Sequence, residues 1–99
     1  MIESILNLIK EDNLVSRSRK RELVHKRIYL YVILRKNGYT LKEIGELFQR
    51  SHATVIHGIN NYKTFKKTGD SLFEADTVPY KALLEGYNIP EGFKRDIFE

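Results

Sequence analysis

The sequence predicts an all-α protein, a helical bundle that contains a helix-turn-helix. Two observations carry this prediction. Apolar residues recur at helical spacing through most of the first 67 positions, and helix-capping residues stand where that pattern breaks. The chain has 99 residues, of which 41% are hydrophobic and 30% charged, so its length and composition are those of one globular domain.

Two helices are predicted in the first 36 residues. The apolar positions of the short one have amphipathic spacing: Ile2, Ile5, Leu6 and Ile9. A second pattern runs from about 21 to 36, and its broad apolar face predicts a buried central helix. That face consists of Leu23, Arg27, Leu30 and Leu34, widened by Val24, Ile28 and Tyr31. Asn37-Gly38 predicts its end, because glycine readily adopts the left-handed C-cap conformation.

Two further helices follow, separated by a tight turn. Thr40 and Glu43 have the spacing of a capping box and predict a helix start. The inward face of this helix consists of Leu41, Ile44, Gly45 and Phe48, and Gly45 is expected to allow another helix close approach. Gln49-Arg50 is the predicted turn, and Ser51 the N-cap of a helix from His52 to about Phe65. We expect Val55, Ile59 and Tyr62 to face inward, with Ile56 beside them. This is the helix-turn-helix layout.

The character of the chain changes after Lys67. Residues 68–71 have turn composition, and residues 72–99 are acidic and contain both prolines. A helix is predicted from Pro79 to Tyr87, with Pro79 in its first turn. We therefore divide the chain into a helix-turn-helix domain at 1–67 and an acidic extension at 68–99 that is partly helical or flexible.

Positive charge is concentrated in one short segment. Residues 1–67 carry a balance of +8 and residues 68–99 a balance of −4. Six basic residues face one acid between 17 and 27: Arg17, Arg19, Lys20, Arg21, Lys26 and Arg27. Such crowded cations repel one another unless a polyanion neutralises them, so we expect a nucleic-acid partner rather than only a solvated loop. Four to six phosphate contacts would give log K a slope of about −4 to −5 against log[salt].

Several other functions are unsupported. There is no cysteine, no phosphate-binding glycine loop and no arrangement of serine, histidine and acid. His52 and His57 do not share a helix face as metal ligands would. We therefore expect no enzyme, no metal and no cofactor. The chain has no apolar run long enough to span a bilayer and no signal peptide, so we expect no membrane partner and a cytoplasmic location.

The start of the last helix of the pair carries small and hydrogen-bonding residues: Ser51, His52, Ala53 and Thr54. Recognition helices present this end to base edges in the major groove of duplex DNA. His52 can donate to a base acceptor, and Ala53 suits a thymine methyl group. Ser51 and Thr54 can reach a base or a phosphate. The alternative is that Ser51 only caps the helix and His52 is solvated.

Three motifs in this order resemble the C-terminal DNA-binding domain of the bacterial replication initiator DnaA. They are the basic residues from Arg17 leading into a long helix, Y-T-L-K-E-I-G-E-L-F from Tyr39, and H-A-T-V-I-H from His52. The resemblance covers about residues 1–67. It implies a Trp-repressor-like helical fold that binds a short duplex site as a monomer, in replication initiation or its control.

The resemblance also implies roles for individual residues. The family's Asp-His-Thr-Thr-Val signature matches positions 51–55, so His52 is implied as a base contact and Thr54 as a backbone contact. Ser51 replaces an acid and Ala53 a threonine, so the resemblance leaves the target sequence open. Arg50 and Lys42 are implied as phosphate contacts, although the family often has proline where Lys42 stands.

The basic segment departs from the family at one position. The family's minor-groove arginine falls nearest His25, which leaves open whether Lys26 or Arg27 makes that contact or whether the contact is lost. An ATPase module precedes this domain in a complete initiator, and these residues contain no phosphate-binding loop, so we expect a stand-alone protein of bacterial or phage origin, or a fragment.

Other functions stay open. They are a transcriptional regulator on the same fold, an RNA-binding protein, and a protein-interaction module that has lost base readout, with the acidic extension as its contact. The extension is also a candidate competitor that folds onto the basic surface and weakens DNA binding.

Overall fold

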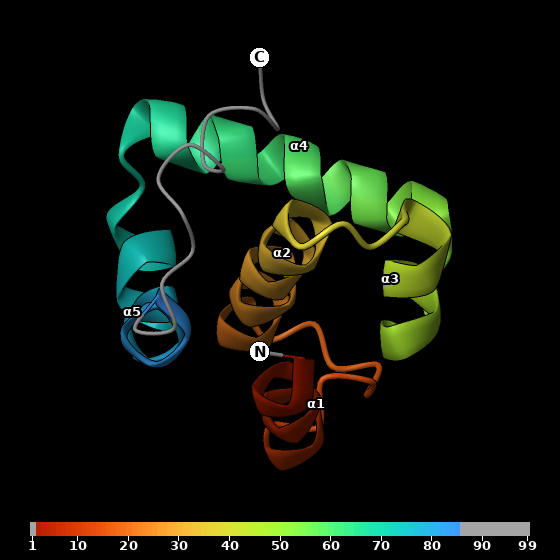
Figure 1. The fold of residues 1–99 in the computed structure, drawn as a ribbon. Coiled ribbons are helices and arrows are strands. Elements are labelled where there is room, and N and C mark those ends of the chain that lie inside the picture. Colours follow the sequence, from red (N-terminus) through yellow and green to blue (C-terminus); the bar gives the residue numbers. More distant parts are fainter. Residues whose placement is uncertain (1, 86–99) are drawn as a thin grey trace.

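Five helices make up residues 2–85, the part of the chain that the structure, a computed structural model, describes (Figure 1). They are α1 (Ile2–Glu11), α2 (Arg21–Lys36), α3 (Leu41–Phe48), α4 (His52–Thr68) and α5 (Ser71–Glu85). Helix α2 lies in the middle, with α3 and α5 on opposite sides, α4 across one end and α1 near the other (Figure 1). The described residues form no strand, and the all-α prediction is confirmed.

Helix α2 is the centre of the core. Every residue from Ile28 to Leu34 is buried, so this stretch is enclosed on all sides by the other helices. Its bounds agree with the prediction. Gly38 follows it with a φ of +90°, a conformation that an L residue rarely adopts, as the glycine C-cap prediction requires.

Helices α3 and α4 begin at the predicted caps. The Thr40 N–H donates to Glu43 Oε1 at 2.9 Å, and the Glu43 N–H donates to Thr40 Oγ1 at 3.1 Å. Ser51 Oγ accepts from the Thr54 N–H at 3.3 Å. The predicted helix-turn-helix layout is therefore present. Helix α4 runs past the predicted end at Phe65 and stops at Gly69, which has a φ of +65°.

Helix α5 differs from the prediction of a helix starting at Pro79. It begins at Ser71, because Asp70 Oδ1 accepts from the Phe73 N–H at 2.9 Å and acts as its N-cap. Pro79 lies inside the helix on its exposed face. Positions 86 and 87 of the predicted helix lie outside the described residues.

Helix α5 and the first four helices share one hydrophobic core. Phe73, Tyr80 and Leu84 belong to the same buried cluster as Ile5, Leu30 and Phe48. The part of 68–99 that the structure describes therefore packs as a fifth helix against α2 rather than as a separate unit.

Two apolar side chains, one in the predicted apolar pattern of the first helix and one beside the predicted inward face of the last, are exposed. Leu6 is 43% exposed and Ile56 40% exposed. In α1 the core positions are Ile5, Leu8 and Ile9, so its buried face is rotated away from Leu6. In α4 Val55 and Gly58 face α2, which turns Ile56 toward solvent.

We predict that Gly45→Ala lowers the free energy of unfolding by about 1–3 kcal/mol, the usual effect of overpacking. A Cβ on Gly45 would lie 2.5 Å from the Arg50 carbonyl oxygen, so the turn between α3 and α4 would have to shift. The close neighbour of Gly45 is therefore this turn, whereas the sequence predicts a neighbouring helix. Thermal unfolding followed by circular dichroism measures the effect. Glu46→Ala, at an exposed position of the same helix, is the control; equal stability of both variants would contradict the prediction.

Candidate nucleic-acid interface

The turn between α3 and α4 sets the direction in which α4 begins. Gln49 ends α3 in the left-handed conformation with a φ of +55°, which is uncommon for a residue other than glycine. The Arg50 N–H closes the turn by donating to the Gly45 carbonyl at 2.8 Å. Val55, which is fully buried, anchors the first turn of α4 to the core.

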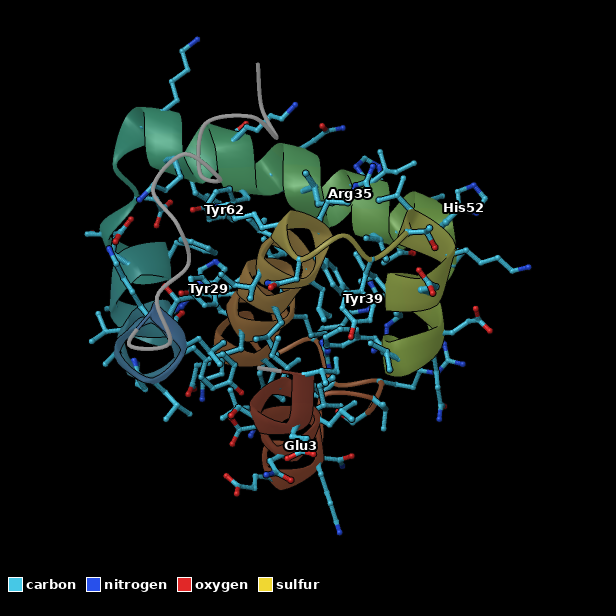
Figure 2. All side chains as sticks on the ribbon, in the orientation of Figure 1. Glu3, Tyr29, Arg35, Tyr39, His52 and Tyr62 are labelled. Carbon is cyan, nitrogen blue, oxygen red and sulfur yellow. The ribbon has the colours of Figure 1, made fainter. Side chains whose placement is uncertain are left out.

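The four residues predicted to address bases lie together at this exposed helix start. Ser51, His52, Ala53 and Thr54 are all exposed, and His52 lies at the outer end of α4 (Figure 2). Ser51 and Thr54 also hydrogen-bond to each other through their hydroxyl groups, at 3.1 Å. The side chains of His52 and Ala53 therefore take no part in capping the helix. Those of Ser51 and Thr54 take part in the cap and are exposed as well.

The exposed cations of the basic segment precede α2. Arg17, Arg19 and Lys20 are all exposed. Two serine hydroxyls shape the backbone here, because Ser16 Oγ accepts from the Ser18 N–H at 3.4 Å and Ser18 Oγ from the Lys20 N–H at 3.3 Å. Lys42 is a fourth exposed cation, in the first turn of α3.

Arg27 and Arg50, predicted as DNA-backbone contacts, point into the protein. The three nitrogens of the Arg27 side chain donate to the carbonyls of Leu14, Ser18 and Ser16 at 2.8, 2.8 and 2.9 Å. Arg50 donates to the carbonyls of Ser16 and Phe48. Burial lowers the pKa of Arg27, and the charge of the neighbouring Arg50 lowers it further.

Arg21, His25 and Lys26 have acidic partners from other elements. Arg21 Nε and Nη2 donate to Asp76 of α5 at 3.0 and 3.4 Å, and His25 Nδ1 lies 2.8 Å from the same carboxyl. Lys26 Nζ lies 3.5 Å from Asp12 Oδ2. His25 is buried, and the edges of its ring meet Phe65 and Phe73, with centroids 5.2 Å apart in each pair. In this structure His25 is a core residue, not a member of an exposed loop.

Sequence reasoning missed Asp76 and Asp12 as partners of these three side chains. Asp76 lies 51 positions from His25 and 55 from Arg21 along the chain. Local spacing contains no signal for such a pair. The Arg21 guanidinium holds the pKa of Asp76 below its usual range, and the bond to His25 acts in the same direction.

Residues 2–85 contain no group of three or more histidine and acidic side chains that could hold a metal ion. None of their helices combines the length and apolarity that crossing a membrane requires.

Comparison with known proteins identifies a family. A family model described as the bacterial DnaA protein helix-turn-helix matches residues 7–61. The chromosomal replication initiator protein DnaA of Oleidesulfovibrio alaskensis is 48% identical over 54 residues, which is 54% of this chain and 12% of that protein. The initiator of Kosmotoga olearia is 31% identical over 88 residues, 88% of this chain and 18% of that protein. The chain thus spans less than a fifth of the length of these relatives. No solved structure gives a significant match.

An exposed helix start behind a tight turn, next to a cationic segment, places the chain in the class of helix-turn-helix proteins. The match over more than half of the chain makes the assignment specific: it belongs to the family of bacterial DnaA helix-turn-helix domains.

We predict that Asp76→Asn lowers the melting temperature at pH 7. The pKa of Asp76 is depressed in the folded state, so its stabilising effect is present above the ordinary aspartate pKa of about 4 and is lost as the pH falls through the depressed value. The difference in melting temperature between variant and unchanged protein should therefore shrink as the pH falls below about 4.

Glu74→Gln is the matched control for Asp76→Asn. Glu74 lies on the same helix and pairs with Lys66 at 3.5 Å, but the two side chains are 41% and 47% exposed, so the pair contributes little. Thermal melts across this pH range measure both variants. If the difference in melting temperature caused by Asp76→Asn stays constant across this pH range, the ion pair of Asp76 is not the source of the stabilisation.

Proposed function

We propose that this protein binds double-stranded DNA in a sequence-specific manner. The start of α4 would enter the major groove, and the basic segment would follow the phosphates and reach the adjacent minor groove. The observation that carries this proposal is a contact between the two surfaces, the start of α4 and the basic segment. Arg50, the residue before the helix start, also donates to the Ser16 carbonyl next to Arg17, so both surfaces are fixed relative to each other.

The exposed residues suit base readout and backbone contact in different ways. His52 offers a ring nitrogen as donor, and the Ala53 methyl offers an apolar contact to thymine. Ser51 and Thr54, whose hydroxyls hydrogen-bond to each other, suit a phosphate oxygen or one base edge. Ile56 is exposed one turn further along α4 and is a second apolar side chain, after Ala53, that this helix offers to the DNA.

We infer that this binding serves the initiation of DNA replication or its control, because the relatives with closely similar sequences are chromosomal replication initiators. The protein would act as a monomer in the bacterial cytoplasm at the nucleoid, as a binding protein without a cofactor or catalytic step. A protein partner at the acidic extension would connect this binding to other components.

We predict a salt slope of about −3 to −4 for log K against log[salt], from four free cations at about −0.9 per phosphate contact. The four are Arg17, Arg19, Lys20 and Lys42. This is shallower than a count of all basic residues would give, because Arg21, Lys26, Arg27 and Arg50 have partners within the protein. Fluorescence anisotropy with labelled duplex at 50–300 mM salt measures it. A slope of −6 or steeper would mean that DNA displaces these partners.

We predict that selection on random duplex DNA at about 0.15 M salt enriches one short motif. His52→Ala should weaken binding to that motif by about 1–3 kcal/mol, the usual worth of a good base contact, and relax the sequence preference at one position. Thr54→Ala should weaken binding while changing the preference less.

The control for these variants is Thr64→Ala, at an exposed position in the C-terminal half of α4, which should bind the selected motif as the unchanged protein does. Single-stranded RNA added as competitor tests the RNA alternative. If no motif is enriched and binding vanishes as salt rises, sequence-specific recognition is wrong, and a protein-interaction module becomes the better description.

A further inference from the structure

The segment between α1 and α2 is held by two guanidinium groups. The segment is outside any helix, so the backbone carbonyls of Leu14, Val15, Ser16 and Ser18 have no helical N–H as donor. Arg27 of α2 donates to three of them at 2.8–2.9 Å. Arg50 donates to the Ser16 carbonyl and, at 3.4 Å, to that of Val15. The Ser16 carbonyl thus accepts from both arginines.

The two arginines come from different parts of the fold. Arg27 lies in the second turn of the central helix, whereas Arg50 lies in the turn that starts α4. Arg50 also donates to the Phe48 carbonyl at 2.8 Å, which ties its guanidinium to the end of α3. The segment is therefore fixed to the central helix and to the helix-turn-helix at one point, directly before Arg17.

These contacts leave Arg27 little capacity to bind a phosphate. Its side chain uses all three nitrogens on carbonyls of the segment, and the residue is only 6% exposed. The two positively charged guanidinium groups are tolerated near each other because carbonyl oxygens accept hydrogen bonds from both. Both side chains thus use their N–H groups to bind the segment.

We propose that Arg27 and Arg50 are positioning residues for DNA binding: they hold Arg17 and Arg19 where they meet the duplex while α4 occupies the major groove. The proposal rests on the proposed function and adds how its two surfaces are aligned. A lysine in place of either arginine keeps the charge but offers a single donor group without the planar fork. The charge-conserving substitution therefore separates positioning from simple phosphate attraction.

The test is a double-mutant cycle between Arg50 and the exposed cations. Arg50→Lys is combined with the pair Arg17→Ala and Arg19→Ala, and affinity for the selected duplex is measured at several salt concentrations. In the otherwise unchanged protein, removing the two cations should weaken binding about tenfold or more and reduce the salt slope by about two. In the Arg50→Lys background, the same removal should cost less than about threefold, because the cations are already misplaced.

Arg35→Lys is the matched control for the cycle. Arg35 also donates to a backbone carbonyl, that of Tyr39 at 3.0 Å, but outside the segment, so its effect should add to that of the two cations. Circular dichroism establishes that each variant keeps its helices. Arg27→Lys provides a second cycle; it is buried and more disruptive, so the half-buried Arg50 carries the main test.

Amide hydrogen exchange gives a readout that does not depend on DNA. Arg50→Lys should speed exchange at residues 16–20 while that of the α2 core stays unchanged. Strictly additive losses in the cycle, or unchanged exchange in the segment, would overturn the positioning role while leaving DNA binding in place. Failure of the unchanged protein to bind any duplex would instead overturn the proposed function, and the positioning role with it.

Discussion

The carbonyl groups of one irregular segment impose the main constraint on this structure. Residues 14–18 lie in the connection between α1 and α2, outside both helices, and partly buried carbonyls there need donors from elsewhere. Two arginines supply these donors. Because Arg27 and Arg50 are used in this way, the orientation of the basic segment depends on both the central helix and the turn before α4.

The same constraint divides the basic residues into two groups. Those at the start of the cluster, Arg17, Arg19 and Lys20, are exposed. From Arg21 onward, Asp76 pairs with Arg21 and Asp12 with Lys26, and Arg27 is buried. Tyr80 of α5 also donates a hydrogen bond to Asp12, so α5 organises both acids around the start of α2. Asp76 and Asp12 thus act within the described part of the fold and leave a narrower cationic surface than the sequence suggests.

The helices and their caps could be predicted from the sequence because their causes are local. The capping box at Thr40, the N-cap at Ser51 and the glycine after α2 each depend on residues within a few positions. Helix α5 was predicted incompletely for the opposite reason. Pro79 suggested a helix start, whereas the Asp70 cap and the packing of Phe73 against the core decide where α5 begins.

The sequence by itself determined the helix-turn-helix, the family resemblance and the exposed residues at the start of α4. These follow from short-range periodicity and from a contiguous motif. Only the tertiary structure decided which cations are free, because Asp76 reaches Arg21 and His25 across more than 50 positions of chain. It also decided that Arg27 and Arg50 bind carbonyls, since a guanidinium can donate to a phosphate or to a carbonyl and the fold decides which of them lies near.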